Sequence, residues 1–486
     1  MTDRIRNLLS NRPQNGRLSA QNNSLIKTIC TVLVAIATIA ACVLPMDKLP
    51  LWNGEKPDHR NQYELMAEAI LDGRIDFAYG DDYELSQLEN PYDPDARAEA
   101  GVYYHWDHAY YNGHYYMYFG IVPVFLVFLP YRIITGTALT TYHATQIFVA
   151  LAIAGIFLLF HLLSKLFFKN LSYGIYLALS VAFSVMSVWY ASAEPALYCT
   201  AITAAIALEI WSLYFFIRGV WGEKKENRQI LFAGIGALFG ALAFGCRPPI
   251  ALANVLVLPM LIAFLKQRKF TPKLFGKLAL AATPYVVVGI SLMIYNYVRF
   301  DSPFEFGQAY QLTVADQSNY KITLNWDTIV RIFNETLNNF LGRKNFTATF
   351  PYINASGAFF NFPILFMSVL IFKSSVIKDM KQNKLLLLFV GLILAVLVIN
   401  AFDIMWTPYL LERYRMDIYF LMGIGCFIAV GLRYKESTPK QRFDLSVVTV
   451  VLAVITVVSA YLLCIRTMGA YYPEVITEIA DALHLN

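Results

Sequence analysis

Charged residues are scarce in this chain. Of its 486 residues, 15% are charged and 57% are apolar, and the mean hydropathy is +0.48. A typical soluble domain carries about 25% charged and about 45–50% apolar residues. The deficit excludes an ordinary soluble enzyme and an intrinsically disordered protein. We therefore expect an all-α polytopic membrane protein.

Cysteine and nucleotide-binding motifs are also lacking. The six cysteines include no C-x-x-C pair, which argues against a zinc ribbon and a disulfide-stapled scaffold. The chain has no P-loop motif, so ATP-driven transport is not expected. No nucleic-acid-binding module is visible either. We expect neither a nucleotide nor a nucleic acid among the partners.

Long apolar runs are abundant. A helix needs about 20 apolar residues to cross a bilayer. Eleven runs meet this length and predict eleven transmembrane helices, at about 25–45, 143–164, 172–190, 198–217, 230–246, 249–266, 276–296, 356–373, 384–402, 415–432 and 444–465. The shorter run 121–134 contains two prolines, and we expect it to be re-entrant or interfacial. If it spanned the membrane, the count would be twelve.

The distribution of basic residues predicts the orientation. With eleven helices and a cytoplasmic N-terminus, the inside segments hold 24 of the 39 lysines and arginines. Counting 121–134 as a span would place three of these basic clusters outside, against the positive-inside rule. The predicted organisation is a cytoplasmic tail (1–24), a first helix (25–45), an outer loop with surface helices (46–142), helices 2–7 (143–296), a large outer loop (297–355), helices 8–11 (356–465) and an outer tail (466–486).

Three arginines at predicted outer helix ends are candidate phosphate ligands. Arg247 interrupts two apolar runs, and Arg413 and Arg415 precede the tenth predicted helix. A guanidinium in the membrane is costly, but at the interface it can bind a phosphate through two donors. The alternatives are an ordinary interfacial arginine at 247, and an ion network that the segment 412–417 satisfies within itself.

Four acidic residues on the predicted outer side are candidates for acid–base chemistry. Asp58 follows the first helix, beside a segment, 61–71, whose spacing predicts a surface helix. A carboxylate there can deprotonate a hydroxyl nucleophile. Glu194 could support a polar network or start the next helix, and Asp93 and Asp107 are the next candidates for a base. Each could instead be a solvated loop acid.

The segment 103–119 is unusually aromatic, with nine aromatic residues in seventeen. Aromatic faces combined with polar edges suit sugar rings, although a belt at headgroup level would have the same composition. The histidines of this segment form only a weak metal-ligand pattern, so a divalent metal stays open and none is assigned. The candidate cleft residues here are His105, Trp106, Asp107 and Tyr116.

Several of these motifs together resemble the C-type integral-membrane glycosyltransferases, which include protein O-mannosyltransferases and aminoarabinose transferases. These proteins typically carry Pro-Asp-Glu-x-x-Tyr in the first outer loop, followed by a surface helix. The stretch from Pro57 through Asp58 to Tyr63 and the helix ending at Gly73 look similar, with His59 in place of the second acid. Ala193-Glu194-Pro195 and Gly245-Cys246-Arg247-Pro248 are similar to further family elements.

The resemblance implies an inverting glycosyltransferase of a bacterial cytoplasmic membrane, with its site facing outward. Asp58 would be the base, and Arg247, helped by Arg413 or Arg415, would bind the donor phosphate. The implied partners are a polyprenyl-phosphate sugar, a cell-envelope acceptor and membrane lipids. The alternative is a lipid-linked-sugar flippase or a component of polysaccharide export or polymerisation. We expect a transporter to carry charged residues deep in its spans, whereas the acids and arginines noted above gather at the outer ends.

Overall fold

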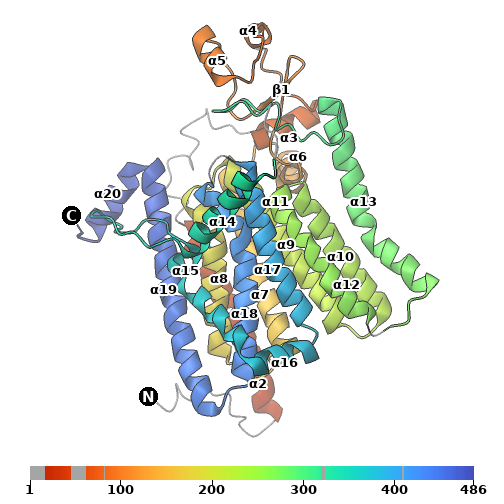
Figure 1. Ribbon diagram of the computed structural model, residues 1–486, viewed down its shortest axis with the longest axis vertical. Coiled ribbons are helices and arrows are strands. Elements are labelled where there is room, and N and C mark those ends of the chain that lie inside the picture. The colour runs from red at the N-terminus through yellow and green to blue at the C-terminus, as the bar shows by residue number, and fades with distance from the viewer. Residues whose placement is uncertain are drawn as a thin grey trace.

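The chain folds into a bundle of long helices with a lobe of short elements at one end (Figure 1). The computed structural model describes residues 17–44, 62–80, 83–266, 268–318, 323–407 and 410–485, with the side chains of 17–22 excluded. Within these ranges, ten helices are long and apolar enough to cross a membrane. Their elements are α2 (Arg17–Val43), α7 (Thr141–Phe167), α8 (Tyr173–Ala193), α9 with η5 (Leu197–Gly222), α10 (Glu226–Phe244), α11 with η6 and α12 (Pro248–Leu265), α13 (Pro272–Phe300), α17 (Leu386–Trp406), η8 with α18 (Glu412–Lys435) and α19 (Pro439–Tyr471).

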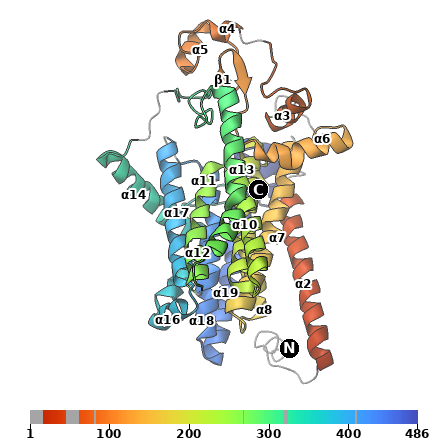
Figure 2. The ribbon, with the colours of Figure 1, turned by 90° about the vertical axis from the view of Figure 1, so that its right-hand side faces the viewer.

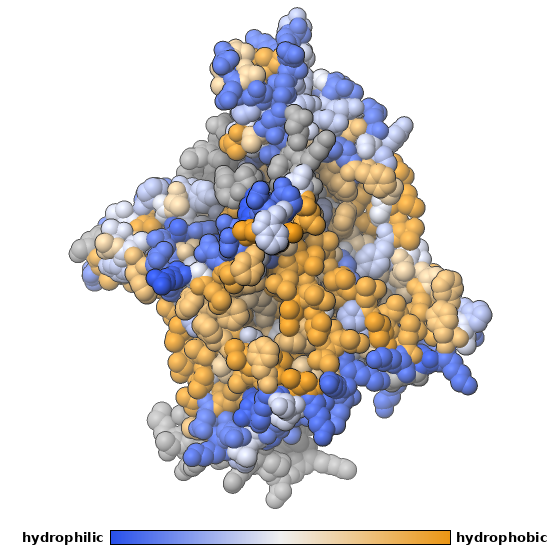
Figure 3. Space-filling model, in the orientation of Figure 1, coloured by the Kyte–Doolittle hydropathy of each residue, from blue (hydrophilic) through white to orange (hydrophobic). Residues whose placement is uncertain are grey.

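The surface confirms a polytopic membrane protein. On the face shown in Figure 3, a broad apolar band crosses the bundle, with polar residues above and below it. Inside the band, α8, α9 and α18 are the most buried helices, while α2 and α13 expose most of their apolar side chains. An all-α membrane protein has this distribution because lipid tolerates exposed leucine and valine, and because helices satisfy their own backbone hydrogen bonds.

Two apolar segments form shorter helices. The prediction of a long α-helix over 356–373 is wrong: the segment divides into α15 (Ala358–Asn361) and the 3₁₀-helix η7 (Pro363–Phe372). Pro363 has no N–H to donate and forces an extended conformation on Phe362, whose φ and ψ are −128° and 80°. The run 121–134 becomes the π-helical turn η4 (Val124–Phe128) and α6 (Leu129–Thr135), which lies across the end of the bundle in Figure 2.

A lobe covers the end of the bundle near α11, and we call this end the lobe end. The lobe holds α3 (Gln62–Leu71), α4 (Tyr83–Ser86), α5 (Pro94–Ala100) and the strands β1 (Ala109–Tyr111) and β2 (His114–Tyr116). The strands form an antiparallel hairpin whose turn, Asn112-Gly113, has positive φ at both residues. Outside the lobe lie α14 (Trp326–Leu341), α16 (Ser374–Gln382) and α20 (Pro473–Ala482).

The second large loop joins the lobe through backbone hydrogen bonds. The amide of Tyr110 donates to the carbonyl of Tyr310, and the amide of Leu312 donates to the carbonyl of His108, both at 2.9 Å. Arg299, at the end of α13, donates from Nη1 to the carbonyl of Met117 at 2.7 Å. The two long loops that were predicted to share one side of the membrane therefore form a single structure over the lobe end.

Candidate active site at the lobe end

Arg247 lies beneath the lobe at the junction of α10 and α11, beside the ends of α17 and α18. It is the N-cap of α11, because the two prolines that follow start this helix after α10 has ended. Its Nε donates to Oδ2 of Asp417 at 2.7 Å, and its Nη2 lies 3.8 Å from Oδ1 of Asp403. Burial alone would lower the pKa of Arg247, but the carboxylates of Asp417 and Asp403 outweigh burial and raise it. The guanidinium is therefore a fixed, permanent cation.

Arg413 provides a second cation close by. Its guanidinium lies 4.1 Å from the ring centre of Tyr198 and 5.3 Å from that of Tyr414. The guanidinium of Arg247 lies 4.4 Å from the Tyr414 ring, so this ring contacts both cations. Within the described ranges Arg413 forms no ion pair, and its buried Nε has no hydrogen-bond partner. Donors of Arg413 are thus available to an anion.

Asp107 approaches the same point from the lobe. It precedes β1 with a φ of 57°, and it is only 5% exposed. Its carboxylate accepts hydrogen bonds from the hydroxyl of Tyr198 and, at 2.9 Å, from Nε2 of Gln311. Burial raises the pKa of Asp107, against the opposing effects of the Tyr198 hydrogen bond and of the Arg413 charge. The carboxylate therefore faces the cation of Arg413 across Tyr198.

Glu194, on the bundle side, lies within the electrostatic reach of Arg413. It follows the last turn of α8 and is 7% exposed. Burial raises its pKa to about 7, although the charge of Arg413 and a hydrogen bond from Cys199 act in the opposite direction. Because this pKa lies near neutrality, Glu194 can exchange a proton in the physiological range.

Aromatic and amide side chains complete the site. The ring of Trp106, 48% exposed, lies beside the polar pair of Asp107 and Tyr198. Tyr63, on α3, is fully buried within the electrostatic reach of Arg247, and Tyr118 is half-buried within the electrostatic reach of Tyr414. The resulting cluster combines aromatic faces, carboxylates and two guanidinium groups.

Four of the predicted site residues lie elsewhere. Arg415 donates from Nη1 to the carbonyl of Ser356 at 2.9 Å and fixes the loop before α15. Asp93 caps α5 by accepting from the amide of Asp95. The other two belong to the aromatic core of the lobe: His105 stacks on Tyr79 and Tyr116 packs against Phe300.

Asp58, the predicted base, lies outside the described residues, and its role stays a prediction. The described chain resumes at Gln62, the first residue of α3. Gln62 itself belongs to the site, since its Nε2 donates to the carbonyl of Asp107 at 2.7 Å and its Oε1 accepts from the amide of Tyr118 at 2.8 Å. The segment that carries Asp58 thus leads directly into residues that hold the cluster together.

Asp403 and Tyr198 were not predicted as site residues, and Asp417 was expected only as part of a local ion network. Asp403 has a visible signal, because a carboxylate near the end of an apolar run is costly unless a cation pairs with it. The pairings of Tyr198 with Asp107 and of Asp417 with Arg247 have no such signal, since the partners lie on distant segments of the chain.

The histidines of the lobe do not converge on a metal. His108 uses both ring nitrogens, Nε2 with the hydroxyl of Tyr79 and Nδ1 with the carbonyl of Trp106, each at 2.9 Å. Burial lowers its pKa to about 4, so the ring is neutral. His114 instead contacts Asp76 at 3.0 Å. In the described ranges, no group of three or more His, Cys, Asp or Glu side chains is placed to hold a metal ion.

A second polar cluster lies deep in the bundle, which corrects the view that the acids gather only at helix ends. Glu209 lies near the middle of the span Leu197–Gly222 and is 1% exposed. Its Oε1 accepts from Nδ2 of Asn254 at 2.6 Å, and the hydroxyl of Tyr285 donates to Oδ1 of Asn254. Gly240 permits this approach, because a Cβ there would lie 2.0 Å from Oδ1 of Asn254.

Comparison with known proteins yields structural neighbours only. No protein-family model and no curated protein matches the chain. The crystal structure of ArnT from Cupriavidus metallidurans bound to undecaprenyl phosphate aligns at a TM-score of 0.44 and 13% identity, over 86% of this chain and 62% of that one. The apo Archaeoglobus fulgidus oligosaccharyltransferase aligns at 0.47 and 12% identity, over 90% of this chain and 55% of that one. The chain thus spans less than two thirds of either neighbour, and likeness at this level does not establish a shared activity.

Proposed function

We propose that this protein is a membrane glycosyltransferase that moves a sugar from a polyprenyl-phosphate donor to an acceptor hydroxyl at the lobe end. The observation that carries the proposal is the pair of guanidinium groups, of Arg247 and Arg413, on one tyrosine ring beneath the lobe. A lipid phosphate fits this pair, because its head can reach the end of the bundle while its tail stays in the membrane.

The two arginines have different tasks in this proposal. Asp417 and Asp403 hold Arg247 in place and neutralise much of its charge. Arg413 forms no ion pair with a described carboxylate, although it lies within the electrostatic reach of Asp107 and Glu194, and its Nε is left without a hydrogen-bond partner. Fixed cations placed where negative charge develops are the main source of catalysis in such sites. Arg413 would therefore be the principal phosphate ligand, with Arg247 beside it.

The reaction would be a single in-line displacement. The acceptor oxygen attacks the anomeric carbon, the bond from that carbon to the phosphate oxygen breaks, and its electron pair leaves with the phosphate. The acceptor proton passes to a carboxylate, for which the family resemblance favours Asp58. Asp107 is the second candidate, because it already faces Arg413 across Tyr198. Attack from the side opposite the phosphate inverts the anomeric configuration.

The remaining site residues suit a sugar. The partly exposed ring of Trp106 offers a stacking surface, and Asp107, Glu194 and Gln311 offer hydrogen-bonding groups around it. The positive-inside distribution favours an outward-facing lobe in a bacterial cytoplasmic membrane. The acceptor would then be a component of the cell envelope.

A lipid-linked-sugar transporter is the second candidate, and Glu209 is the observation that favours it. Charged groups near the middle of a span are typical of transport pathways. In this protein, however, the carboxyl of Glu209 is hydrogen-bonded to Asn254, and no described cation lies within ion-pair distance of it. The arrangement serves helix packing at least as well as transport.

The test is release of free polyprenyl phosphate by the full chain in lipid, with a panel of polyprenyl-phosphate sugars and a cell-envelope extract as acceptor. Asp58→Asn and Arg413→Met would each be compared with Arg74→Met. Arg74 is a lobe arginine with an exposed ion pair to Asp72, so it controls for loss of an arginine outside the site.

We expect release by the unaltered protein and by Arg74→Met, and its loss in the other two variants. If Asp58→Asn keeps activity while Arg413→Met loses it, the base is another acid, Asp107 first. If no donor gives release but a lipid-linked sugar crosses sealed vesicles, the protein is a transporter and the proposal is wrong.

A further inference from the structure

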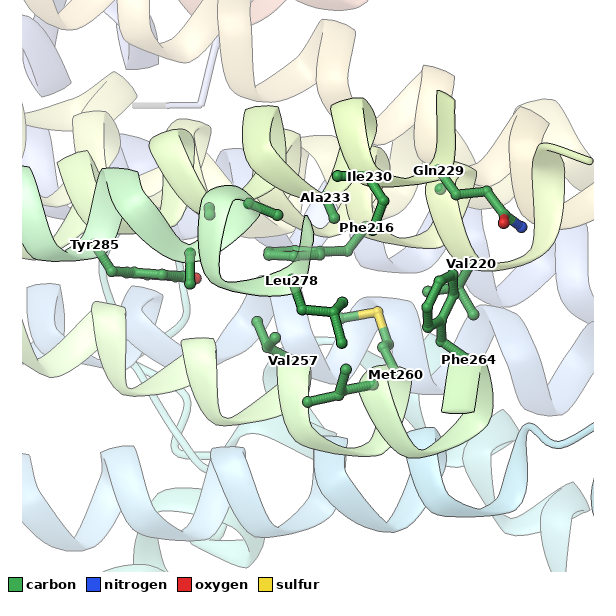
Figure 4. A pocket seen from close by; sticks show the side chains of 15 residues that line it. Phe216, Val220, Gln229, Ile230, Ala233, Val257, Met260, Phe264, Leu278 and Tyr285 are labelled. Atoms are coloured by element: carbon green, nitrogen blue, oxygen red, sulfur yellow. The ribbon is translucent and has the colours of Figure 1, made fainter. Parts of the chain in front are cut away.

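An apolar cavity opens between α10, α12 and α13, remote from the candidate active site. Its volume is about 130 Å³, and it is partly open to the surroundings. Figure 4 shows its long shape, with Tyr285 at one end and Gln229 at the other. Between these two polar ends the wall consists of side chains such as Ala233, Met260 and Leu278. A space of this shape and lining fits a hydrocarbon chain.

The cavity opens on the flank of the bundle that faces lipid. Helix α13, which forms one wall, leaves Leu280 69% and Val286 58% exposed. Near its start, Phe270 and Phe275 are 64% and 60% exposed, with ring centres 6.2 Å apart. Exposed aromatic rings are typical of the membrane–water boundary. A lipid of the surrounding bilayer can therefore reach the cavity without crossing water.

The mouth at the Gln229 end is strongly basic. The two helix connections beside it, residues 218–229 and 266–277 with the helix ends that they include, hold nine basic and two acidic residues, and we call this surface the basic end. The acids are already paired: Glu223 with Arg218 and Arg228, and Glu226 with Lys277. The other basic residues of these connections form no ion pair within the described ranges. Positive charge is thus left over around the mouth.

One guanidinium connects this basic surface to the cavity itself. Arg268 donates from Nη2 to Oε1 of Gln229 at 2.6 Å, and its guanidinium lies 3.8 Å from the ring centre of Phe264. Gln229 is 5% exposed, and both Gln229 and Phe264 line the cavity. Arg268 therefore lies at the entrance, with exposed Lys269 next to it in the chain and exposed Lys273 in the first turn of α13.

We propose that this cavity binds one acyl chain of an anionic phospholipid, whose phosphate lies among Arg268, Lys269 and Lys273. The apolar cavity would hold the acyl chain, and the unpaired positive charge at its mouth would attract the anionic headgroup. The acyl chain of a zwitterionic lipid would fill the cavity equally well, but its headgroup would be attracted less strongly by the basic residues at the mouth. The site is separate from the proposed transferase chemistry, so either can fail without the other.

The test is lipid binding to the purified full chain by native mass spectrometry. The probes are phosphatidylglycerol and phosphatidylcholine with the same acyl chains. We expect one tightly bound phosphatidylglycerol per chain, with a dissociation constant at least tenfold below that of phosphatidylcholine. Each lysine near an anionic headgroup is worth about a fivefold change in affinity, so Lys269→Gln/Lys273→Gln should weaken phosphatidylglycerol binding by roughly 25-fold.

Two further variants keep the result interpretable. Ala282→Phe places a ring in the cavity from an exposed position, and it should weaken both lipids alike. Lys378→Gln/Lys381→Gln removes two exposed lysines from α16, at the same end of the bundle, and should change neither. Equal binding of the two lipids by the unaltered chain, or unchanged phosphatidylglycerol binding by Lys269→Gln/Lys273→Gln, would overturn the proposal.

Discussion

The bundle holds two buried polar clusters that differ in how completely their groups are satisfied. Nδ2 of Asn254 donates to Oε1 of Glu209 and to the carbonyls of Gly240 and Ala251. Oδ1 of Asn254 accepts from the hydroxyl of Tyr285. This cluster is closed. At the lobe end, by contrast, Nε of Arg413 and Oδ1 of Asp417 are buried without a described partner.

This difference indicates that the cluster around Asn254 serves helix packing, whereas the cluster at the lobe end can bind a ligand. Buried polar groups are normally paired, because an unpaired one costs about 1–3 kcal/mol. Groups left open beside a cleft are therefore candidates for binding something else. The four predictions that follow test the contrast between the open and the closed cluster.

The largest effect is expected at Arg247. Arg247→Met leaves the buried carboxylates of Asp403 and Asp417 without their cation, and removing one partner of a buried pair typically costs about 3–5 kcal/mol. We expect a large drop in the unfolding temperature in detergent and no release of polyprenyl phosphate. The double variant Arg247→Met/Asp417→Asn should recover part of the stability and none of the activity. Recovery of both would make Arg247 purely structural.

Arg413 should behave differently, because it forms no close ion pair within the described chain. Loss of one fixed charge that stabilises a developing negative charge typically costs about 10²–10³-fold in rate. Arg413→Met should therefore lose activity to this degree while its unfolding temperature stays close to that of the unaltered protein. Arg413→Lys should restore part of the rate. A variant that melts early but turns over normally would contradict this division of tasks.

Glu194 allows a test by pH. Burial raises its pKa from an ordinary value near 4.5 to about 7. Between these two pH values the folded protein keeps a proton on Glu194 that the unfolded chain has released. The contribution of Glu194 to the free energy of unfolding is therefore complete below about pH 4.5 and is lost as the pH rises to about 7. The share lost is about 3 kcal/mol. Between pH 5 and pH 8, the unfolding temperature should fall more in the unaltered protein than in Glu194→Gln.

The matched control is Glu84→Gln, which removes an exposed acid in the lobe. Its pH dependence should follow that of the unaltered protein. If the pH dependence of Glu194→Gln also follows that of the unaltered protein, the pKa of Glu194 is the same in the folded and unfolded states, and the prediction is wrong.

The predicted spans agree closely with the helices because long apolar runs are a local property of the sequence. The exception, 356–373, depends on Pro363, whose effect on the backbone outweighs hydropathy. The hairpin at Asn112-Gly113 was missed although that dipeptide is a strong turn signal. Each strand of this hairpin is only three residues long, so neither forms an apolar run of the kind that predicts a membrane helix.

The candidate site could be predicted only in part. Arg247, Arg413, Glu194 and Asp107 were recognised as chemically suited, and the structure brings them together. Their partners could not be predicted, because Asp403 lies at the far end of another helix and meets Arg247 only through packing. Conversely, Arg415 looks equivalent to Arg413 in sequence, yet a helix turn directs it to the carbonyl of Ser356.

The smallest effect is expected in the closed cluster. Glu209→Gln keeps an oxygen that can accept from Nδ2 of Asn254, so the hydrogen bond survives while the ability to ionise is lost. We expect a stability change within about 1 kcal/mol and polyprenyl phosphate release within about twofold of the unaltered protein. If Glu209 instead carried a proton or cation through the membrane, the same substitution would abolish movement of a lipid-linked sugar across sealed vesicles. Measuring release and movement in one vesicle preparation separates these cases, because a packing role leaves both nearly unchanged and a transport role removes the second.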